Sequence, residues 1–247
     1  MARFVLVHGA FAGAWAWGPL TERLEAAGHS VESFDLPGLG EDETPVAEVT
    51  LDACADRLCR VLRSSEEPAI VVPNSMGGVV TTQAAARCPE RVASIVYVAA
   101  FVPEDGESLL ALTQRPEGAG DQVQANIVVE GDPAVGTMPD EASVGALYGC
   151  CEENVAGWAV AHQRPQPVAP FETPVSLEDS EAFEAIPRRY VLCKQDRAIP
   201  PALQRLMAER RDCQEIVELD TDHSPHLSAT AELAEILDRF ATREPVS

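Results

Sequence analysis

The residues around Ser75 combine a buried-strand pattern with a run of small side chains. An apolar run over residues 69–72 leads into Pro73 and Asn74, and Ser75 is followed by Met-Gly-Gly. A strand, a sharp turn and a small-residue helix start would place the serine hydroxyl at the apex of the turn, where strand and helix backbones nearly touch. Ser75 is therefore a candidate nucleophile, although a serine between a strand and a helix is also a common N-cap.

A serine nucleophile needs a base to take its proton and an acid to orient that base. Both are expected after Ser75 in the chain, just beyond strand ends at the carboxyl edge of a parallel sheet. Asp196 lies three residues past an apolar run that ends at Cys193, and His223 lies four residues past a run that ends at Leu219. These positions make Asp196 the candidate acid and His223 the candidate base.

Other acidic and histidine residues compete for the same roles. Asp105 follows an earlier expected strand and is a rival acid, while Asp196 is also of a type that is common in turns. His226 is a rival base, but it falls at the start of the last expected helix, where a histidine is usually a solvated first-turn residue. His8 is interpreted as a structural, hydrogen-bonding histidine. We prefer Asp196 and His223.

The segment His8-Gly-Ala-Phe11 closes the first expected strand. A glycine-containing loop at this place supplies one backbone N–H to an oxyanion, and the residue after the nucleophile supplies the other. The expected oxyanion hole therefore consists of the N–H groups of Ala10 and Met76. Phe11 and Met76 adjoin these donors, so we expect both side chains to contact the substrate.

Apolar, strand-like runs alternate with helical patterns along most of the chain. The expected strands are residues 3–7, 30–34, 69–72, 92–99, 189–193 and 215–219. The expected helices are residues 17–27, 51–63, 76–87, 202–211 and 229–242. Near-continuously apolar strands joined by helices indicate a parallel sheet covered on both faces. The pattern predicts an α/β protein with a mostly parallel, doubly wound sheet of about six strands.

The alternation fails between residues 103 and 186. This stretch is rich in Pro, Gly, Glu and Gln and holds only short helical patterns, at residues 142–148 and 153–162. A length of 247 residues is ordinary for a single α/β domain. We therefore expect one domain, with a core of residues 1–102 and 187–247 and an inserted helical cap of residues 103–186.

The composition excludes several classes of partner. A formal net charge of −22 and a pI near 4.4 would repel a phosphate backbone and an anionic lipid surface, so we expect neither nucleic acid nor membrane as a partner. No apolar run reaches the roughly 18 residues of a membrane span, and no leader pattern is present at the N-terminus. These features predict a cytoplasmic protein. The oligomeric state is left open, with a homodimer as one option.

No set of His, Cys and carboxylate residues has the spacing of a metal site. The seven cysteines are odd in number and irregularly spaced, which favours reduced thiols, and the adjacent Cys150 and Cys151 would make a poor metal clamp. We expect neither a metal nor a cofactor. The expected partner is a small-molecule ester substrate.

Several short motifs occur together along the chain. They are Phe4-Val-Leu-Val-His-Gly-Ala10, Gly13-Ala-Trp15, Glu25-Ala-Ala-Gly-His29, Asp35-Leu36, Ser75-Met-Gly-Gly78, Val98-Ala-Ala-Phe101, Tyr190-Val-Leu-Cys-Lys-Gln-Asp196, Ile199-Pro200 and Asp222-His223. In this combination the sequence resembles the α/β-hydrolase superfamily over nearly its whole length, and within it the plant methyl esterase and hydroxynitrile lyase group with its bacterial esterase relatives. The resemblance implies Ser75 as nucleophile, His223 as base, Asp196 as orienting acid, and Ala10 and Met76 as the oxyanion hole.

The chain departs from that group at several positions. Pro73-Asn74 stands where the group has Gly-His, and because proline has no N–H we expect a slightly displaced turn, which glycine and histidine would restore with higher turnover of simple esters. Ala12 stands where plant members often have histidine, so their substrate contacts are not carried over. Ser224 stands where the lyases have lysine. This change disfavours lyase chemistry because departing cyanide would lack its cationic helper.

These features together predict a serine hydrolase that cleaves a small, largely apolar carboxylic ester. Two alternatives stay open. The same scaffold serves biosynthetic enzymes that catalyse cyclisation, lactone opening or another non-hydrolytic step, since a fold does not fix a function. The chain is alternatively a small-molecule binding protein that has lost turnover. A complete triad argues against this second alternative because a pure binder has no need of all three groups.

Overall fold

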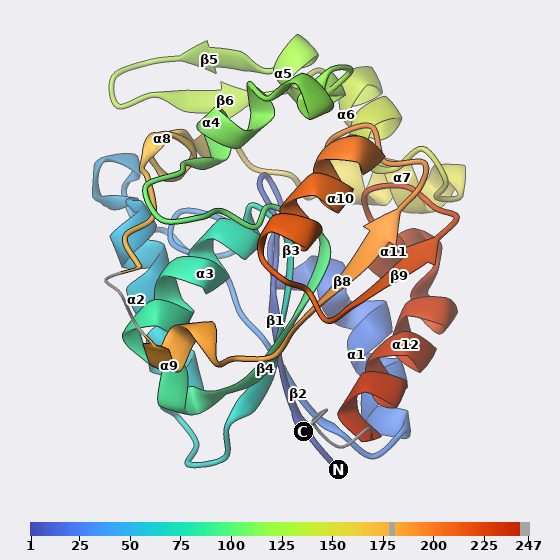
Figure 1. Ribbon diagram of the computed structural model, residues 1–247. Helices are drawn as coiled ribbons and strands as arrows, with labels where there is room; N and C mark the ends of the chain where they lie inside the picture. The colour runs from blue at the N-terminus through green and yellow to red at the C-terminus, as the bar shows by residue number, and fades with distance from the viewer. Residues whose placement is uncertain (178–180, 243–247) are drawn as a thin grey trace.

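The centre of the structure is a parallel β-sheet, seen in the computed structural model of residues 1–177 and 181–242 (Figure 1). Its strands are β1 (Arg3–Val7), β2 (Ser30–Ser33), β3 (Ala69–Ser75), β4 (Val92–Ala100), β8 (Arg188–Cys193) and β9 (Glu215–Leu219). The order across the sheet is β2-β1-β3-β4-β8-β9, and every neighbouring pair is parallel. The predicted α/β class and the six-stranded sheet are confirmed.

Helices cover both faces of this sheet (Figure 1). Helices α1 (Gly18–Ala26) and α12 (Thr230–Thr242) pack on one face, whereas α2 (Leu51–Leu62), α3 (Gly77–Arg87) and α10 (Pro201–Arg210) pack on the other. Successive strand residues point to opposite faces. Phe4 and Leu6 of β1 therefore join the first layer, and Val5 and Val7 join the second. Burial on both faces explains why the inner strands β1, β3 and β4 are largely apolar, whereas the edge strands β2 and β9 are partly exposed and carry polar residues.

Between β4 and β8 the chain builds a layer over the carboxyl ends of the strands, which we call the cap (Figure 1). Its helices are α4 (Leu109–Thr113), α5 (Gln122–Asn126), α6 (Asp140–Leu147), α7 (Glu153–Ala161) and α8 (Ala169–Glu172). The cap also holds an antiparallel sheet of β5 (Val128–Glu130), β6 (Val135–Thr137) and β7 (Gln166–Pro167), which was not expected. Strands this short leave no readable alternation in the sequence.

The remaining elements are short. They are α9 (Glu181–Glu184), α11 (Pro225–Ser228) and the 3₁₀ helices Ala14–Trp17, Val46–Glu48, Pro89–Arg91 and Pro116–Gly118. Helix α9 lies within the residues expected to form the cap, yet it packs against α3 of the core. The exact division into core and cap stays a prediction.

The strand β3 is longer than predicted. It continues past Val72 to Ser75, and Pro73 lies opposite Val7 of β1 in the parallel ladder. Val7 is the last residue of β1, so Pro73 sits where this pairing ends and its missing N–H interrupts little of the ladder. The helix expected to start at Met76 starts at Gly77.

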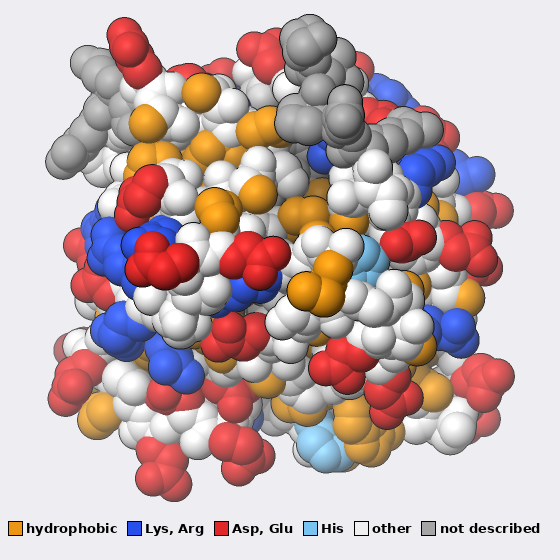
Figure 2. Space-filling view, turned by 90° about the horizontal axis from the view of Figure 1, so that it is seen from below, with side chains coloured by type: hydrophobic (Ala, Val, Ile, Leu, Met, Phe, Trp, Pro, Cys, Tyr) orange, Lys and Arg blue, Asp and Glu red, His pale blue; other side chains and the backbone are white. Residues whose placement is uncertain are grey.

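On the face opposite the cap, the acidic side chains are dispersed. Figure 2 shows the face opposite the cap, where acidic side chains are spread over the whole view and mixed with arginine and lysine. Such mixing favours solubility over a single docking field. Within residues 1–177 and 181–242, no helix combines the length and apolar character that a membrane span requires.

Gly77 provides a test of the contact between α3 and β1. A Cβ on Gly77 would lie 2.6 Å from the carbonyl oxygen of Val7 and 2.8 Å from that of His8, and neither backbone group has room to move. We predict that Gly77→Ala lowers the free energy of unfolding by about 1–3 kcal/mol, measured by urea denaturation. The matched control is Gly157→Ala, because Gly157 is exposed in α7 with open space around it.

Gly157→Ala is expected to raise the unfolding free energy by up to about 1 kcal/mol through helix propensity. Equal stability of Gly77→Ala and the wild type would contradict the close approach of α3 and β1.

Candidate active site

Ser75 ends β3 in a strained backbone conformation. Its φ is +53°, in the left-handed region that a serine rarely adopts. The turn is held by its surroundings: the carbonyl oxygen of Ser75 accepts a hydrogen bond from Phe101 N at 3.1 Å, and a Cβ on Gly78 would overlap the carbonyl oxygen of Phe101. The strand therefore turns sharply into α3 at Ser75, and Pro73 lies within the strand two residues before this turn.

Asp196 and His223 form a buried hydrogen-bonded pair. His223 Nδ1 donates to Asp196 Oδ2 at 2.8 Å. The other oxygen of Asp196 accepts from Ala198 N at 2.7 Å and Ile199 N at 2.9 Å, and Gln204 Nε2 donates to Oδ2 at 2.9 Å. The carboxylate is thus fixed in one orientation. Because Nδ1 carries the proton in this bond, Nε2 of neutral His223 is left as a base.

The surroundings of His223 favour its charged form. Burial alone would lower the pKa of the ring, but the charge and hydrogen bond of Asp196, with smaller contributions from Asp222 and Asp121, raise the pKa above the ordinary value of 6.5. An imidazolium that forms here during a reaction is therefore stabilised by fixed negative charge.

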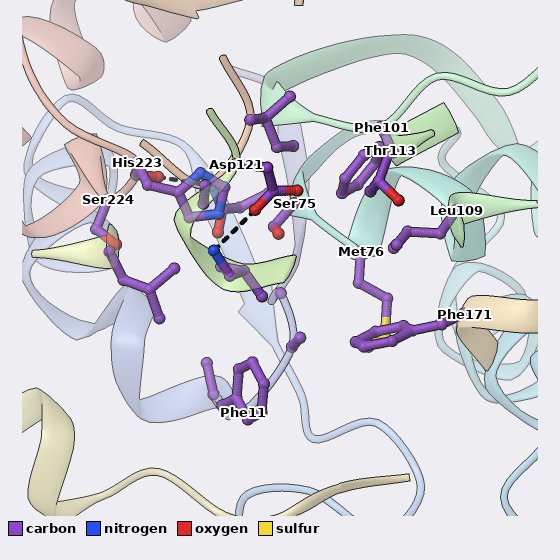
Figure 3. A pocket seen from close by; sticks show the side chains of 18 of the residues that line it. Phe11, Ser75, Met76, Phe101, Leu109, Thr113, Asp121, Phe171, His223 and Ser224 are labelled. Atoms are coloured by element: carbon purple, nitrogen blue, oxygen red, sulfur yellow. Dashed lines mark hydrogen bonds between the residues drawn. The ribbon is translucent and has the colours of Figure 1, made fainter. Parts of the chain in front are cut away.

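One cavity brings Ser75 and His223 together beneath the cap (Figure 3). Most of its lining is apolar, and Phe101, Leu109 and Phe171 lie together on one side of Ser75, with His223 on the other. Asp196 stands behind His223 and does not line the cavity. The arrangement places a strained serine, an oriented imidazole and a largely apolar binding space in one site.

The expected oxyanion donors border the same cavity. Ala10 follows β1 and Met76 precedes the first turn of α3, whose N-terminus favours negative charge. In the part of the chain that the structure describes, neither N–H has a hydrogen-bond acceptor. Phe11 also lines the cavity, but its N–H donates to Gln166 Oε1 of the cap at 3.1 Å. Ala10 and Met76 are therefore available to a developing oxyanion, whereas Phe11 contributes its ring.

Comparison with known proteins places this site in context. A model of the alpha/beta hydrolase family matches residues 4–236. The chain belongs to the alpha/beta hydrolase family. It is similar to methylesterase 7 of Arabidopsis thaliana, with 33% identity over 97% of each chain, and to an alpha-hydroxynitrile lyase of the same plant, with 29% identity over 97% of this chain and 96% of that one. The crystal structure of an Arabidopsis methylesterase superimposes with a TM-score of 0.84 at 26% identity, covering 98% of this chain and 99% of that chain.

The resemblance to the methyl esterase and hydroxynitrile lyase group is thereby confirmed. In this hydrolase, His8 has the structural role that we expected. Its Nδ1 donates to Gly9 O at 2.8 Å and its Nε2 accepts from Leu36 N at 3.0 Å, which fixes the neutral ring. Burial lowers the pKa of His8 and keeps it uncharged. The residue holds the loop that carries Ala10.

Neither the rival acid nor the rival base belongs to the hydrogen-bonded pair, although His226 also lines the cavity. Asp105 Oδ1 accepts from Leu177 N at 2.9 Å, whereas the hydrogen bond to His223 comes from Asp196. The expectation of a solvated His226 is wrong: this ring is buried against Trp17, with 4.5 Å between ring centroids. Helix α11, which carries His226, contacts α1 of the core, so its first turn is not on the surface. Burial lowers the pKa of His226 to about 3, so it stays neutral.

Asn74 lines the cavity and makes contacts that the sequence did not predict. Its Nδ2 donates to Val98 O at 3.0 Å and to the backbone oxygen of His223 at 3.1 Å. The side chain therefore ties the end of β3 to β4 and to the loop that carries His223. Both acceptors are backbone atoms distant in the sequence, so no local pattern marks them. These bonds argue against the expectation that histidine at position 74 would improve turnover.

Asp222 holds the His223 loop to the cap. Its Oδ1 accepts from Ser224 N at 3.0 Å and Ser228 Oγ at 2.7 Å, and its Oδ2 accepts from Cys150 N at 2.7 Å. One buried carboxylate therefore accepts hydrogen bonds both from the cap and from the loop that carries His223. The pairing of Cys150 with a residue far along the chain left no signal in the sequence.

In residues 1–177 and 181–242, no group of three or more His, Cys, Asp and Glu side chains is placed to hold a metal ion. All seven cysteines are free thiols, and Cys150 and Cys151 lie beside Asp222.

The histidine environments can be tested by NMR without knowledge of a substrate. We predict that His223 titrates above the ordinary histidine pKa of 6.5, while His226 stays neutral down to about pH 3. Asp196→Asn removes the first charge that raises the pKa of His223, so its midpoint should fall. Asp105→Asn is the matched control and should leave the midpoint unchanged. The signal is assigned through His223→Gln, and a wild-type midpoint at or below 6.5 would overturn the assigned pairing.

Proposed function

We propose that this protein is an esterase that hydrolyses small, largely apolar carboxylic esters. The observation that carries the proposal is the joint placement of a strained Ser75 and an Asp196-oriented His223 in one apolar cavity. Similarity to methylesterases supports the reaction class and favours a small alcohol group.

The proposed reaction begins when Nε2 of His223 takes the proton of Ser75 and the serine oxygen attacks the ester carbonyl carbon. The N–H groups of Ala10 and Met76 stabilise the resulting oxyanion. Loss of one such donor costs roughly 2.7–4 kcal/mol of transition-state stabilisation. His223 then donates the proton to the leaving alcohol, and a water activated by the same base releases the acid.

The lining of the cavity supports a largely apolar acyl or alcohol group over a carboxylate-bearing substrate. Neither lysine nor arginine is among its lining residues. Ser224 lines the cavity at the position where the resemblance places the lysine of the lyases. A departing cyanide anion would therefore meet no cation, which supports ester hydrolysis over lyase chemistry despite the hydroxynitrile lyase relative.

Two alternatives are distinguished by experiment. A biosynthetic enzyme on this scaffold would react with a serine-directed probe but would not hydrolyse generic esters. A binding protein without turnover would do neither. Hydrolysis and probe reaction together support the esterase.

A fluorophosphonate probe tests the nucleophile without requiring the natural substrate. We predict that intact-mass analysis of the wild type shows one adduct, because a serine hydroxyl is nucleophilic at neutral pH only beside a base. Ser75→Ala should gain none, and His223→Gln should react much more slowly. The control is Ser224→Ala, which removes another hydroxyl at the cavity and should label like the wild type. Labelling of Ser75→Ala at the wild-type rate would exclude Ser75 as the nucleophile.

Asn74 gives a second test, directed at the position of His223. Asn74→Asp keeps the shape but faces two carbonyl oxygens with a carboxylate instead of a donor, and we predict a fall in kcat of about tenfold with a smaller change in KM. Asn74→His should also lower kcat, because one imidazole N–H satisfies at most one of the two acceptors.

Asn126→Asp on the surface of α5 introduces the same charge and is the control. If Asn74→Asp retains the wild-type kcat, the hydrogen bond to the His223 backbone has no part in positioning the base.

A further inference from the structure

Asp121 is a buried carboxylate of the cap that borders the cavity beside Ser75 and His223 (Figure 3). It is only 7% exposed. Its Oδ1 accepts from Val123 N at 2.8 Å and Gln124 N at 2.9 Å, as the N-cap of α5. In the described part of the chain, Oδ2 has no hydrogen-bond partner. An N-cap needs only one oxygen, so the second oxygen is not explained by the fold.

In the described part of the chain, neither lysine nor arginine lines the cavity to neutralise the charge of Asp121. The charge of His223 lowers the pKa of Asp121, but this ring is already hydrogen-bonded to Asp196. The backbone oxygen of Arg197 accepts a hydrogen bond from Gln122 N of α5 at 2.7 Å. Arg197 and Gln122 line a separate hollow on the surface, so Arg197 is not part of the cavity lining. Burial, with the charge of Asp196, raises the pKa of Asp121 to about 6. At neutral pH the carboxylate is therefore mostly ionised, although burying an unpaired charge is costly.

The rest of the cavity offers aromatic faces. Phe11, Phe101, Phe171 and Tyr148 all belong to its lining. Rings of this kind attract a cation through their quadrupole, while a neutral ligand gains only apolar contact from them. An unpaired carboxylate oxygen together with several aromatic rings matches the chemistry of a substituted ammonium group: a charge-assisted N–H donor with an apolar surround.

We propose that Asp121 is a specificity-determining residue that binds a protonated amine on the substrate, so that the preferred esters carry an ammonium group. This inference rests on the proposed esterase function. The amine lies within reach of the catalytic serine because Asp121 and Ser75 share one cavity. The remainder of such an ester stays small and apolar, as the lining requires.

Two isosteric pairs of esters test the proposal, one on each side of the ester bond. The first pair is 2-(dimethylamino)ethyl acetate and 3-methylbutyl acetate, and the second is methyl 4-(dimethylamino)butanoate and methyl 5-methylhexanoate. At pH 7 we expect the wild type to show kcat/KM about tenfold higher for the amine of at least one pair, chiefly through KM. The hydroxyl analogue 3-hydroxybutyl acetate separates a cation from a neutral donor. If that ester is preferred instead, the proposed charge recognition is wrong.

Asp121→Asn then removes the charge with little risk to the fold, because asparagine caps helices as well as aspartate does. Its oxygen would keep the bonds to Val123 and Gln124, which turns an NH₂ group towards the cavity. The ratio of amine to isostere should fall to one or below. Asp140 is an exposed carboxylate at the start of α6, so Asp140→Asn is the matched control and should preserve the wild-type ratio.

The outcomes separate the two proposals. Hydrolysis of both members of each pair at equal kcat/KM would overturn the role of Asp121 and leave the esterase intact. A wild type that neither hydrolyses these esters nor reacts with the fluorophosphonate probe would instead overturn the esterase. An amine preference that survives Asp121→Asn would assign the recognition to another group.

Discussion

The turn at Ser75 is the constraint on which the rest of the site depends. A serine at φ +53° is unfavourable by itself and persists only because α3 starts against the backbones of β1 and β4. Glycines at 77 and 78 allow that approach. The turn also lies between β1 and β3, where the direction of strand addition reverses and the strand ends leave a crevice. The fold thus places a serine and a helix N-terminus at the edge of the sheet where the cavity lies.

A second set of interactions brings the base to that turn. The loops after β8 and β9 are distant from Ser75 in the sequence, and hydrogen bonds from buried polar side chains hold them near it. Gln204 donates to Asp196, and Asn74 donates to the backbone oxygen of His223. Asp222 accepts from Cys150 N of the cap. Each of these groups is satisfied by backbone partners, so the cost of burying it is repaid only in the assembled fold. The position of the base is therefore cooperative with the folding of both the sheet and the cap.

The sequence predicted those features of the fold and the site that depend on local residue patterns. The sheet, its helices and the pairing of Asp196 with His223 followed from apolar periodicity and from positions just past strand ends. Prediction from the sequence was wrong or incomplete where tertiary burial decides the surroundings of a residue. His226 has the local signature of a solvated first-turn residue but is covered by Trp17, and the strands of the cap are too short to show alternation. Asn74 resembled a defect because the partners of its side chain are far away in the chain.

Burial acts on every ionisable group near the cavity in the same direction, towards neutrality, and partners decide which groups keep a charge. His8 and His226 have no carboxylate bonded to them, and their pKa values are lowered. His223 is equally buried, but Asp196 reverses the effect and its pKa is raised. Asp121 differs from all three: burial raises its pKa, and it lines the cavity with one carboxylate oxygen that has no hydrogen-bond partner in the described part of the chain. The N-cap of α5 uses one oxygen of Asp121, and we explain the second oxygen by what enters the cavity, which links the electrostatics of the site to the choice of substrate.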